Sequence, residues 1–233
     1  MTTPLFRDDP YLTTATAAVI DAVDDAIILD RSVFYAAGGG QPGDTGRLET
    51  ADGTMITVSD ARYAKERSAI ALNVETLLPV GSDVTQHLDW QRRYRIMRVH
   101  TALHLLSVVL PYPVTGGQIG DGEGRLDFDI PESPPDKDDL AEKLSNLVVA
   151  DHPVTTEWIT DEELDAKPDL VKTMAVKPPR GSGRVRLVRI GDVDLQPCGG
   201  THVASTAEVG ALAIKKIEKK GRQNRRVRIA LND

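Results

Sequence analysis

The segment DWQRRYRIMRVHTALHLL, residues 89–106, separates two parts of the sequence that differ in character. Asp89 is a suitable N-cap, because its side chain can accept a hydrogen bond from the first backbone N–H groups of a helix. Apolar residues then recur every three or four positions, as on the buried face of a helix, at Ile96, Val99, Leu103, Leu106 and Leu110. Pro111 ends the pattern, so the segment predicts one long amphipathic helix.

Short apolar or alternating runs dominate the sequence before this helix. They cover residues 17–20, 26–30, 55–58 and 69–74, and turn residues such as Asp24-Asp25 and Asp52-Gly53 separate them. Many short strands at this spacing are typical of a small barrel or sandwich. We therefore predict a β-barrel-like domain over residues 1–89.

The sequence after the helix mixes both kinds of element. Strands are predicted at residues 114–120, 125–130, 154–159, 185–190, 211–217 and 226–231, and helices at residues 136–150 and 162–170. The last two strands form a terminal hairpin. Helices and antiparallel strands in this order predict an α+β fold. The second domain, residues 90–233, is expected to have two layers, with helices against an antiparallel sheet.

Composition is ordinary for a soluble globular protein, with 233 residues, 40% apolar and 27% charged. No apolar run is as long as a membrane span, and the N-terminus lacks the apolar core of a signal peptide. A single cysteine excludes an intramolecular disulfide. These features predict a cytoplasmic protein without a membrane partner, and we favour a monomer.

Charge is distributed unevenly along the chain. The segment from Lys215 to Arg228 holds eight basic residues and one acid, so its net charge is +7, whereas the whole chain carries −7 and the remainder therefore −14. A basic strip on an acidic body suits contact with phosphates at one place. A solvated basic hairpin explains the charge equally well.

Two short segments hold side chains that commonly bind metal ions. His100 and His104 are spaced i, i+4 in the predicted helix, and Cys198 and His202 have the same spacing in the motif CGGTH. Each pair alone has a plain structural explanation, since buried histidines and lone buried cysteines are common. Together they supply three nitrogen donors and one sulfur donor, which is a donor set that zinc prefers. We therefore predict one Zn²⁺ ion per chain.

The number of ligands leaves the role of that ion open. Four protein ligands close a tetrahedron, which is typical of structural zinc, whereas catalytic zinc needs an open position for water or substrate. Asp192 and Asp194 are candidate acceptors for the N–H groups of the ligand histidines.

The segment FYAAGGGQPGDTG, residues 34–46, contains three consecutive glycines. Such a run is tolerated where a ligand or another backbone must come close. It is not a Walker loop, because no Gly-Lys-Ser/Thr follows it. A flexible hairpin tip is the alternative interpretation.

The glycine triplet with Gln41, the His-x-x-x-His of residues 100–104, the CGGTH motif and the basic terminal segment occur in one order. This arrangement resembles the freestanding alanyl-tRNA editing proteins of the AlaX family, in particular their medium-length class, and the editing domain of alanyl-tRNA synthetase. The resemblance extends from about Phe34 to Arg228. Ala36-Ala37 departs from the Pro-Glu-type pair expected before the glycines.

The resemblance implies an ATP-independent hydrolase that deacylates tRNA(Ala) charged with serine and, as a lesser substrate, with glycine. A zinc-bound water is then the expected hydrolytic agent. The implied substrate contacts are Gly38, Gly39, Gly40, Gln41, Thr101 and Gln118. The implied tRNA contacts are Lys215, Lys216, Lys219, Lys220, Arg222, Arg225 and Arg226.

Two other functions fit the same residues. The editing domain of threonyl-tRNA synthetase has a similar His/Cys arrangement that works without metal, and His100 and His104 would then act as base and orienting group. A non-catalytic module with a structural zinc and an RNA-binding strip is the second alternative.

Overall fold

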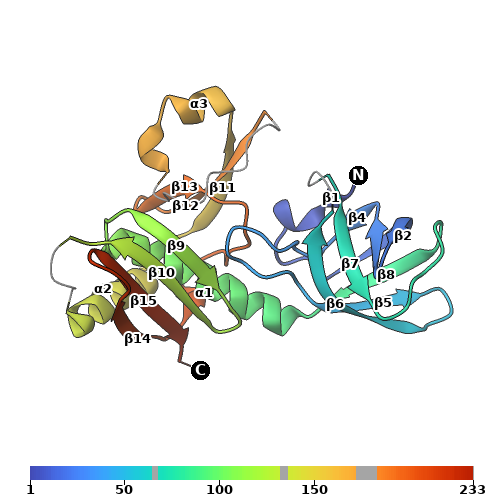
Figure 1. Ribbon diagram of the computed structural model, residues 1–233, viewed down its shortest axis with the longest axis horizontal. Coiled ribbons are helices and arrows are strands. Elements are labelled where there is room, and N and C mark those ends of the chain that lie inside the picture. The colour runs from blue at the N-terminus through green and yellow to red at the C-terminus, as the bar shows by residue number, and fades with distance from the viewer. Residues whose placement is uncertain (65–67, 132–135, 172–182, 233) are drawn as a thin grey trace. The chain divides into compact units, whose positions relative to one another are not determined.

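The computed structural model describes residues 1–64, 68–131, 136–171 and 183–232 (Figure 1). The chain divides into two compact units, Met1–Tyr94 and Arg95–Asp233. Helix α1 (Trp90–Val109) begins in the first unit and continues through the second. Among the described residues, no helix is both long enough and apolar enough to cross a membrane.

The first unit is built around a closed barrel of six antiparallel strands. The strands follow one another around the barrel in the order β2 (Thr14–Val23), β3 (Ala26–Leu29), β7 (Ile70–Val74), β6 (Met55–Tyr63), β5 (Gly46–Thr50) and β8 (Asp83–Leu88). The short strands β1 (Thr3–Pro4) and β4 (Arg31–Ser32) pair in parallel beside a 3₁₀ turn, η1 (Leu5–Arg7).

Alternation along the barrel strands creates its core. In β8 every second residue is buried, because successive side chains of a strand point to opposite faces. β6 buries Ile56, Val58 and Ala61, and its alternation shifts at the irregularity between Val58 and Asp60. The buried cluster includes Val19, Leu48 and Leu72, and also Phe6 and Phe34 from outside the barrel strands. The predicted β-barrel-like region is therefore a complete barrel with its own core.

The second unit contains two antiparallel sheets. The four-stranded sheet has the order β14 (Leu212–Lys219), β15 (Asn224–Leu231), β10 (Glu123–Asp129) and β9 (Val114–Ile119). The three-stranded sheet has the order β11 (Val154–Ile159), β12 (Val185–Ile190) and β13 (Asp194–Pro197). The remaining elements are α2 (Lys137–Val149), α3 (Asp161–Asp165), η3 (Pro168–Leu170) and η4 (Thr206–Val209).

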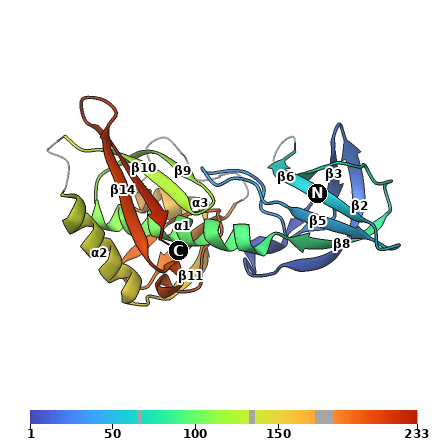
Figure 2. The same cartoon turned by 90° about the horizontal axis from the view of Figure 1, so that it is seen from below.

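Helix α1 lies across one face of the four-stranded sheet (Figures 1 and 2). The approach is close at Gly124 of β10, where a Cβ atom would lie 2.7 Å from Val99 and 3.1 Å from Leu103. Glycine is needed there because any side chain would push the helix away. A different side of α1 carries His104 to Asp194 at the start of β13, so the helix connects both sheets of this unit.

The α+β fold class is confirmed, and most of the predicted elements are present. Asp89 caps α1 as expected, with its side chain accepting from the backbone N–H of Arg92 at 3.2 Å. The single helix predicted at residues 162–170 is wrong. The chain forms α3 and then the separate turn η3, because Pro168 lacks the N–H that would continue the helix.

Candidate metal centre

The four predicted metal ligands lie together in the second unit. His100 and His104 come from neighbouring turns of α1, and Cys198 and His202 come from the loop that follows β13. Their ligand atoms all lie within 4.8 Å of one another. The three histidines are buried, and Cys198 is partly exposed. The cluster therefore opens to solvent mainly on the side of the thiol.

The spacing of the donor atoms fits zinc. Cys198 Sγ lies 3.5 Å from His100 Nε2 and 3.3 Å from His202 Nε2. In a tetrahedral site with Zn–S near 2.3 Å and Zn–N near 2.0 Å, sulfur and nitrogen ligands are separated by roughly 3.5 Å. These side chains could therefore hold a zinc ion without moving far.

Two of the histidines are oriented by hydrogen bonds on their outer nitrogen. His104 Nδ1 lies 3.0 Å from Asp194 Oδ2, and His202 Nδ1 lies 3.2 Å from Thr101 Oγ1. Both arrangements turn Nε2 toward the cluster, which is how ligand histidines are commonly held. Of the two aspartates that the sequence offered as acceptors, Asp194 contacts a histidine, and Asp192 is exposed.

Arg186 holds the loop that carries the cysteine. From β12, its Nη1 atom donates to the carbonyl oxygens of Cys198 at 3.0 Å and Gly200 at 2.9 Å. The backbone N–H of Cys198 donates in turn to the carbonyl oxygen of Arg186 at 3.0 Å. Sequence reasoning missed this residue, because a single arginine in an apolar strand gives no sign of which loop it will meet.

The electrostatics of the cluster favour a thiolate beside a cation. Burial lowers the pKa of His104, but its hydrogen bond to Asp194 and the neighbouring Cys198 raise that pKa more, to about 9 overall. Burial raises the pKa of the Cys198 thiol, yet the charges of His100 and His202 bring it well below its usual value. Burial and the charge of His100 lower the pKa of His202. A thiolate and neutral imidazoles are the forms that bind metal.

The glycine-rich segment forms a tight turn in the first unit. Gly38 and Gln41 form two backbone hydrogen bonds with each other, each 3.0 Å long, and Gly39 and Gly40 between them have φ values of 59° and 85°. Positive φ at both central positions is typical of a type I′ turn and explains the glycines. The Tyr35 hydroxyl donates to the Gly38 carbonyl oxygen at 2.9 Å, so the turn is anchored at its base.

The other predicted substrate contacts are dispersed. Gln41 is 2% exposed and belongs to the buried part of the first unit. Thr101 is fully buried, and its hydroxyl contacts His202 Nδ1 and also lies 3.4 Å from the backbone N–H of Val203. Gln118 is exposed beside Arg125, on the sheet face opposite α1, so it is not part of the His/Cys cluster.

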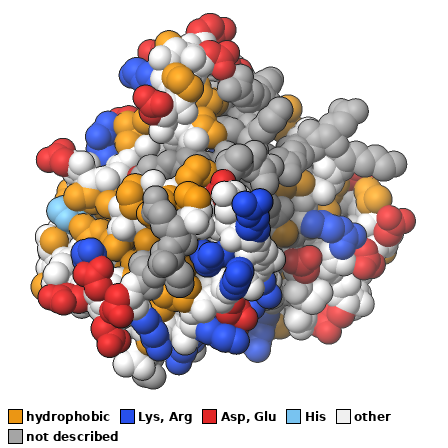
Figure 3. Space-filling view, turned by 60° about the vertical axis from the view of Figure 1, so that its left-hand side comes forward, with side chains coloured by type: hydrophobic (Ala, Val, Ile, Leu, Met, Phe, Trp, Pro, Cys, Tyr) orange, Lys and Arg blue, Asp and Glu red, His pale blue; other side chains and the backbone are white. Residues whose placement is uncertain are grey.

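The basic segment forms the hairpin of β14 and β15, whose tip extends beyond its sheet (Figure 2). Figure 3 shows Lys and Arg side chains gathered on one face of the molecule. Lys215, Lys219, Lys220 and Arg222 are exposed and form no ion pair with other described residues; we call these four the hairpin cations. Lys216 is also exposed but pairs with Glu218 at 3.3 Å.

Two arginines of this hairpin have structural partners. Arg225 is buried and donates from Nη1 to three carbonyl oxygens of the hairpin turn, those of Gly221, Arg222 and Asn224. Arg226 forms two hydrogen bonds with the carboxylate of Asp127, at 2.7 and 2.8 Å. Their positive charge remains near the surface, but their donors already stabilise the sheet.

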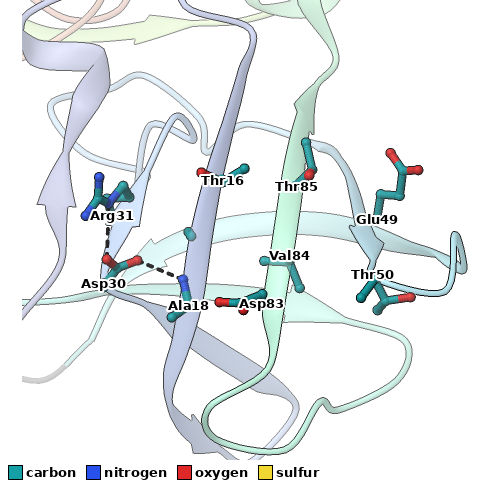
Figure 4. Close-up of a pocket in the computed structure, with 11 residues that line it drawn as sticks. Thr16, Ala18, Asp30, Arg31, Glu49, Thr50, Asp83, Val84 and Thr85 are labelled. Carbon is teal, nitrogen blue, oxygen red and sulfur yellow. Dashed lines mark hydrogen bonds and ion pairs between the residues drawn. The ribbon is translucent and has the colours of Figure 1, made fainter.

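A groove of about 690 Å³ lies on the barrel of the first unit, and none of the predicted site residues lines it (Figure 4). Asp30 in its wall accepts hydrogen bonds from the backbone N–H of Ala18 at 2.9 Å and from Arg31 at 3.1 Å. Its lining holds no cysteine or histidine. We assign no chemistry to this groove.

Two family models match the chain. Residues 185–228 match the threonyl and alanyl tRNA synthetase second additional domain, a region that includes Cys198, His202 and most of the terminal hairpin. Residues 10–92 match the class II (A) tRNA synthetases. The first model is shared by threonyl and alanyl enzymes, so by itself it does not separate the two editing domains considered above.

Full-length relatives are more specific. The chain is 35% identical to the alanyl-tRNA editing protein AlaX-M of Methanosarcina acetivorans over 245 residues, which cover all of both chains. It is 31% identical to the AlaX-M protein of Saccharolobus solfataricus over 97% of this chain and 98% of the relative. It is also 34% identical to the alanine–tRNA ligase of Sulfurisphaera tokodaii, where 94% of this chain matches 25% of the ligase.

Proposed function

The chain belongs to the AlaX family of alanyl-tRNA editing proteins, and we propose that it hydrolyses the ester of tRNA(Ala) mischarged with serine, with glycine as a lesser substrate. One observation carries the proposal: in a chain of this family, three imidazole nitrogens and one thiol converge within 4.8 Å. Hydrolysis of a carboxylic ester is chemistry that such a centre can support.

His100, His104, Cys198 and His202 would hold the zinc ion. When bound, the ion supplies a positive charge that orients the aminoacyl group and polarises its carbonyl. The protein residues provide geometry and access. The buried imidazoles fix the geometry of the centre, and the exposed side of Cys198 leaves a direction of approach for the substrate.

We propose that the glycine turn contacts the aminoacyl end of the substrate. The turn uses the N–H groups of Gly38 and Gln41 for its own hydrogen bonds, so Gly39 and Gly40 at its exposed tip are the better donors for a ligand oxygen. Gln41 is our candidate partner for the hydroxyl of serine. A site that hydrogen-bonds the serine hydroxyl would bind alanine less well, because alanine lacks that hydroxyl.

The hairpin cations are our candidates for contact with tRNA phosphates. They are exposed and have no acidic partner among the described residues, so their charge is available to a polyanion. Arg225 and Arg226 support the hairpin from within. Such contacts position tRNA without reading its sequence. We further propose that the protein acts as a monomer in the cytoplasm.

A deacylation assay tests the function directly. The purified protein should release serine from Ser-tRNA(Ala) and leave Ala-tRNA(Ala) intact, and His104→Ala should abolish the release. His152→Ala is a matched control, because His152 lies outside the cluster. Equal hydrolysis of both esters would contradict the proposed selectivity.

Elemental analysis of the same preparation separates the metal-dependent reaction from the metal-free one. The raised pKa of His104 beside Asp194 gives the metal-free mechanism a candidate acid. Stoichiometric zinc, with activity lost on chelation and restored by added zinc, supports the zinc centre. Full activity in a protein with no metal supports the metal-free reaction instead, and stoichiometric zinc without deacylation supports the RNA-binding module.

A further inference from the structure

We propose that Asp194 is a positioning residue for His104 and the counter-charge of the metal centre, and that Gln196 and Ser107 hold it in place. The inference rests on the zinc centre proposed above and adds three residues to it. Asp194 and Gln196 lie on β13, and Ser107 lies one turn after His104 on α1. The sequence offered Asp194 as a candidate acceptor, but it gave no sign of a role for Gln196 or Ser107.

The four residues form a closed ring of hydrogen bonds. His104 Nδ1 lies 3.0 Å from Asp194 Oδ2, and the same oxygen lies 2.7 Å from Gln196 Nε2. Gln196 Nε2 also lies 3.1 Å from Ser107 Oγ, which in turn lies 2.7 Å from the carbonyl oxygen of His104. All four residues are buried. The ring therefore joins the side chain of His104 to its own backbone through a second element.

The carboxylate of Asp194 fixes the direction of every bond in this ring. A carboxylate only accepts, so both His104 Nδ1 and the Gln196 amide nitrogen must donate to it. Since Gln196 Nε2 donates to Ser107 as well, the Ser107 hydroxyl must donate its own proton to the His104 carbonyl oxygen. With a metal ion bound, His104 would thereby be held in the tautomer whose Nε2 lone pair faces the cluster.

Charge gives Asp194 a second role. A Zn²⁺ ion with one thiolate and three neutral imidazoles leaves a net charge of +1 in a largely buried site, which is costly. The Asp194 side chain has no solvent exposure and touches a ligand, so its carboxylate brings the total to zero. Among the described residues, the cluster of ligand atoms itself contains no Asp or Glu, so the counter-charge must come from a residue that touches a ligand.

The contact between Thr101 and His202 provides an internal comparison. His202 is oriented in the same way, but its partner is a neutral hydroxyl at 3.2 Å. Hydrogen bonds to an ionised acceptor are roughly twice as strong as those between neutral groups. Removal of the Asp194 charge should therefore weaken metal binding more than removal of the Thr101 hydroxyl.

Zinc competition with a chromophoric chelator tests the inference on the full-length protein. Asp194→Asn keeps the shape of the side chain and removes its charge, and it should weaken zinc binding by roughly 10- to 100-fold. Gln196→Met should weaken binding less, and Thr101→Val should also fall short of Asp194→Asn. Asp192→Asn is the matched control, since the same substitution at an exposed site two residues away should leave affinity unchanged.

Two measurements would not respond to the substitution if Asp194 only stabilised the fold: the visible spectrum of the Co²⁺-loaded protein, and the difference in urea unfolding with and without zinc. The visible spectrum of the Co²⁺-loaded protein should shift in Asp194→Asn and stay the same in Asp192→Asn. Urea unfolding should show a larger loss of stability for Asp194→Asn with zinc than without it. Equal losses with and without zinc would mean that Asp194 only stabilises the fold, and would overturn the inference.

The outcomes also separate this inference from the proposed function. A wild-type protein that binds zinc, together with an Asp194→Asn variant whose affinity stays within twofold, refutes the role of Asp194 alone. A wild-type protein that binds no zinc refutes the metal centre and this inference together. Loss of zinc affinity in Asp194→Asn supports the inference whatever ester the protein prefers.

Discussion

Arg93 and Asp44 form an ion pair in which neither side chain has any solvent exposure. The guanidinium of Arg93 also donates to the carbonyl oxygens of Pro10 and Val33 at 2.9 and 2.8 Å, and Asp44 also accepts from the backbone N–H of Tyr35 at 2.6 Å. The pair joins the first turn of α1 to the segment that follows the glycine turn.

Loss of this carboxylate should strongly destabilise the first unit. Asp44→Ala leaves a buried guanidinium without its counter-charge, and breaking a buried pair in this way typically costs about 3–5 kcal/mol. Urea unfolding at neutral pH measures the change. The exposed residue Asp83 is the control, and Asp83→Ala should stay within about 0.5 kcal/mol of the wild type. Similar values for both variants would contradict the prediction.

The glycine turn allows its fold and its proposed contact role to be tested separately. A Cβ at Gly43 would overlap the carbonyl oxygen of Ala61, so Gly43→Ala should disrupt the barrel. Gly39 has open space around its Cβ position but a φ of 59°, so Gly39→Ala should cost only about 1–2 kcal/mol. Unfolding and deacylation should be measured on both variants. A folded Gly39→Ala protein with full activity would exclude the tip of the turn from the substrate site.

Zinc affinity should rise with pH. In the metal-free protein His104 has a pKa of about 9, so zinc must displace a proton from it at neutral pH. Burial raises the pKa of the Cys198 thiol, but the charges of His100 and His202 bring it well below its usual value, so the thiol contributes less to this pH dependence than an ordinary cysteine would. The logarithm of the zinc association constant should therefore increase with a slope near one between about pH 7 and pH 8. A slope of zero would contradict the raised pKa of His104 in the metal-free protein.

The hairpin cations should account for much of the salt dependence of tRNA binding. Replacing all four with alanine should lower the slope of log affinity against log salt by roughly 3, because each phosphate contact contributes somewhat less than one. Filter binding at several salt concentrations measures this slope. Lys143→Ala on α2 is the control, since Lys143 already pairs with Asp139 at 2.8 Å. An unchanged slope in the fourfold variant would remove the hairpin from the interface.

Glu218 should titrate at unusually low pH. Its hydrogen bond to Arg228 and its contact with Lys216 lower its pKa from 4.5 to about 2. A lowered pKa in the folded state stabilises the fold above pH 4.5, and this contribution is lost as pH falls toward 2. Carboxyl NMR titration should show a midpoint near 2 in the wild type. The midpoint should move toward 4.5 in Arg228→Gln, and an unchanged midpoint there would contradict the assigned cause.

The sequence predicted the parts of this protein that depend on local patterns. The recurrence of apolar residues from Ile96 to Leu110 was enough for α1, because a helix satisfies its backbone hydrogen bonds within its own segment. Spacing also identified the two ligand pairs: His100 and His104 share one face of a helix, and Cys198 and His202 lie four positions apart in a loop. The chemistry of the four donors then suggested zinc.

Other features depended on contacts between distant segments. Closure of the barrel required the pairing of β2 with β8, and no local pattern specifies which strands will meet. The sequence treated Arg225 and Arg226 as tRNA contacts, but the tertiary structure gives them carbonyl and carboxylate partners. The residue type shows that a side chain is charged. The tertiary structure determines whether that side chain is exposed to a ligand or bonded within the protein.

The metal centre likewise depends partly on local sequence and partly on tertiary contacts. The sequence alone determined which side chains could bind an ion, because ligand chemistry belongs to each residue. Only the tertiary structure brought α1 and the loop after β13 together, and with them the Asp194–Gln196–Ser107 ring that holds His104. Those contacts join residues about 90 positions apart, and packing around a common core determines which distant polar groups become neighbours.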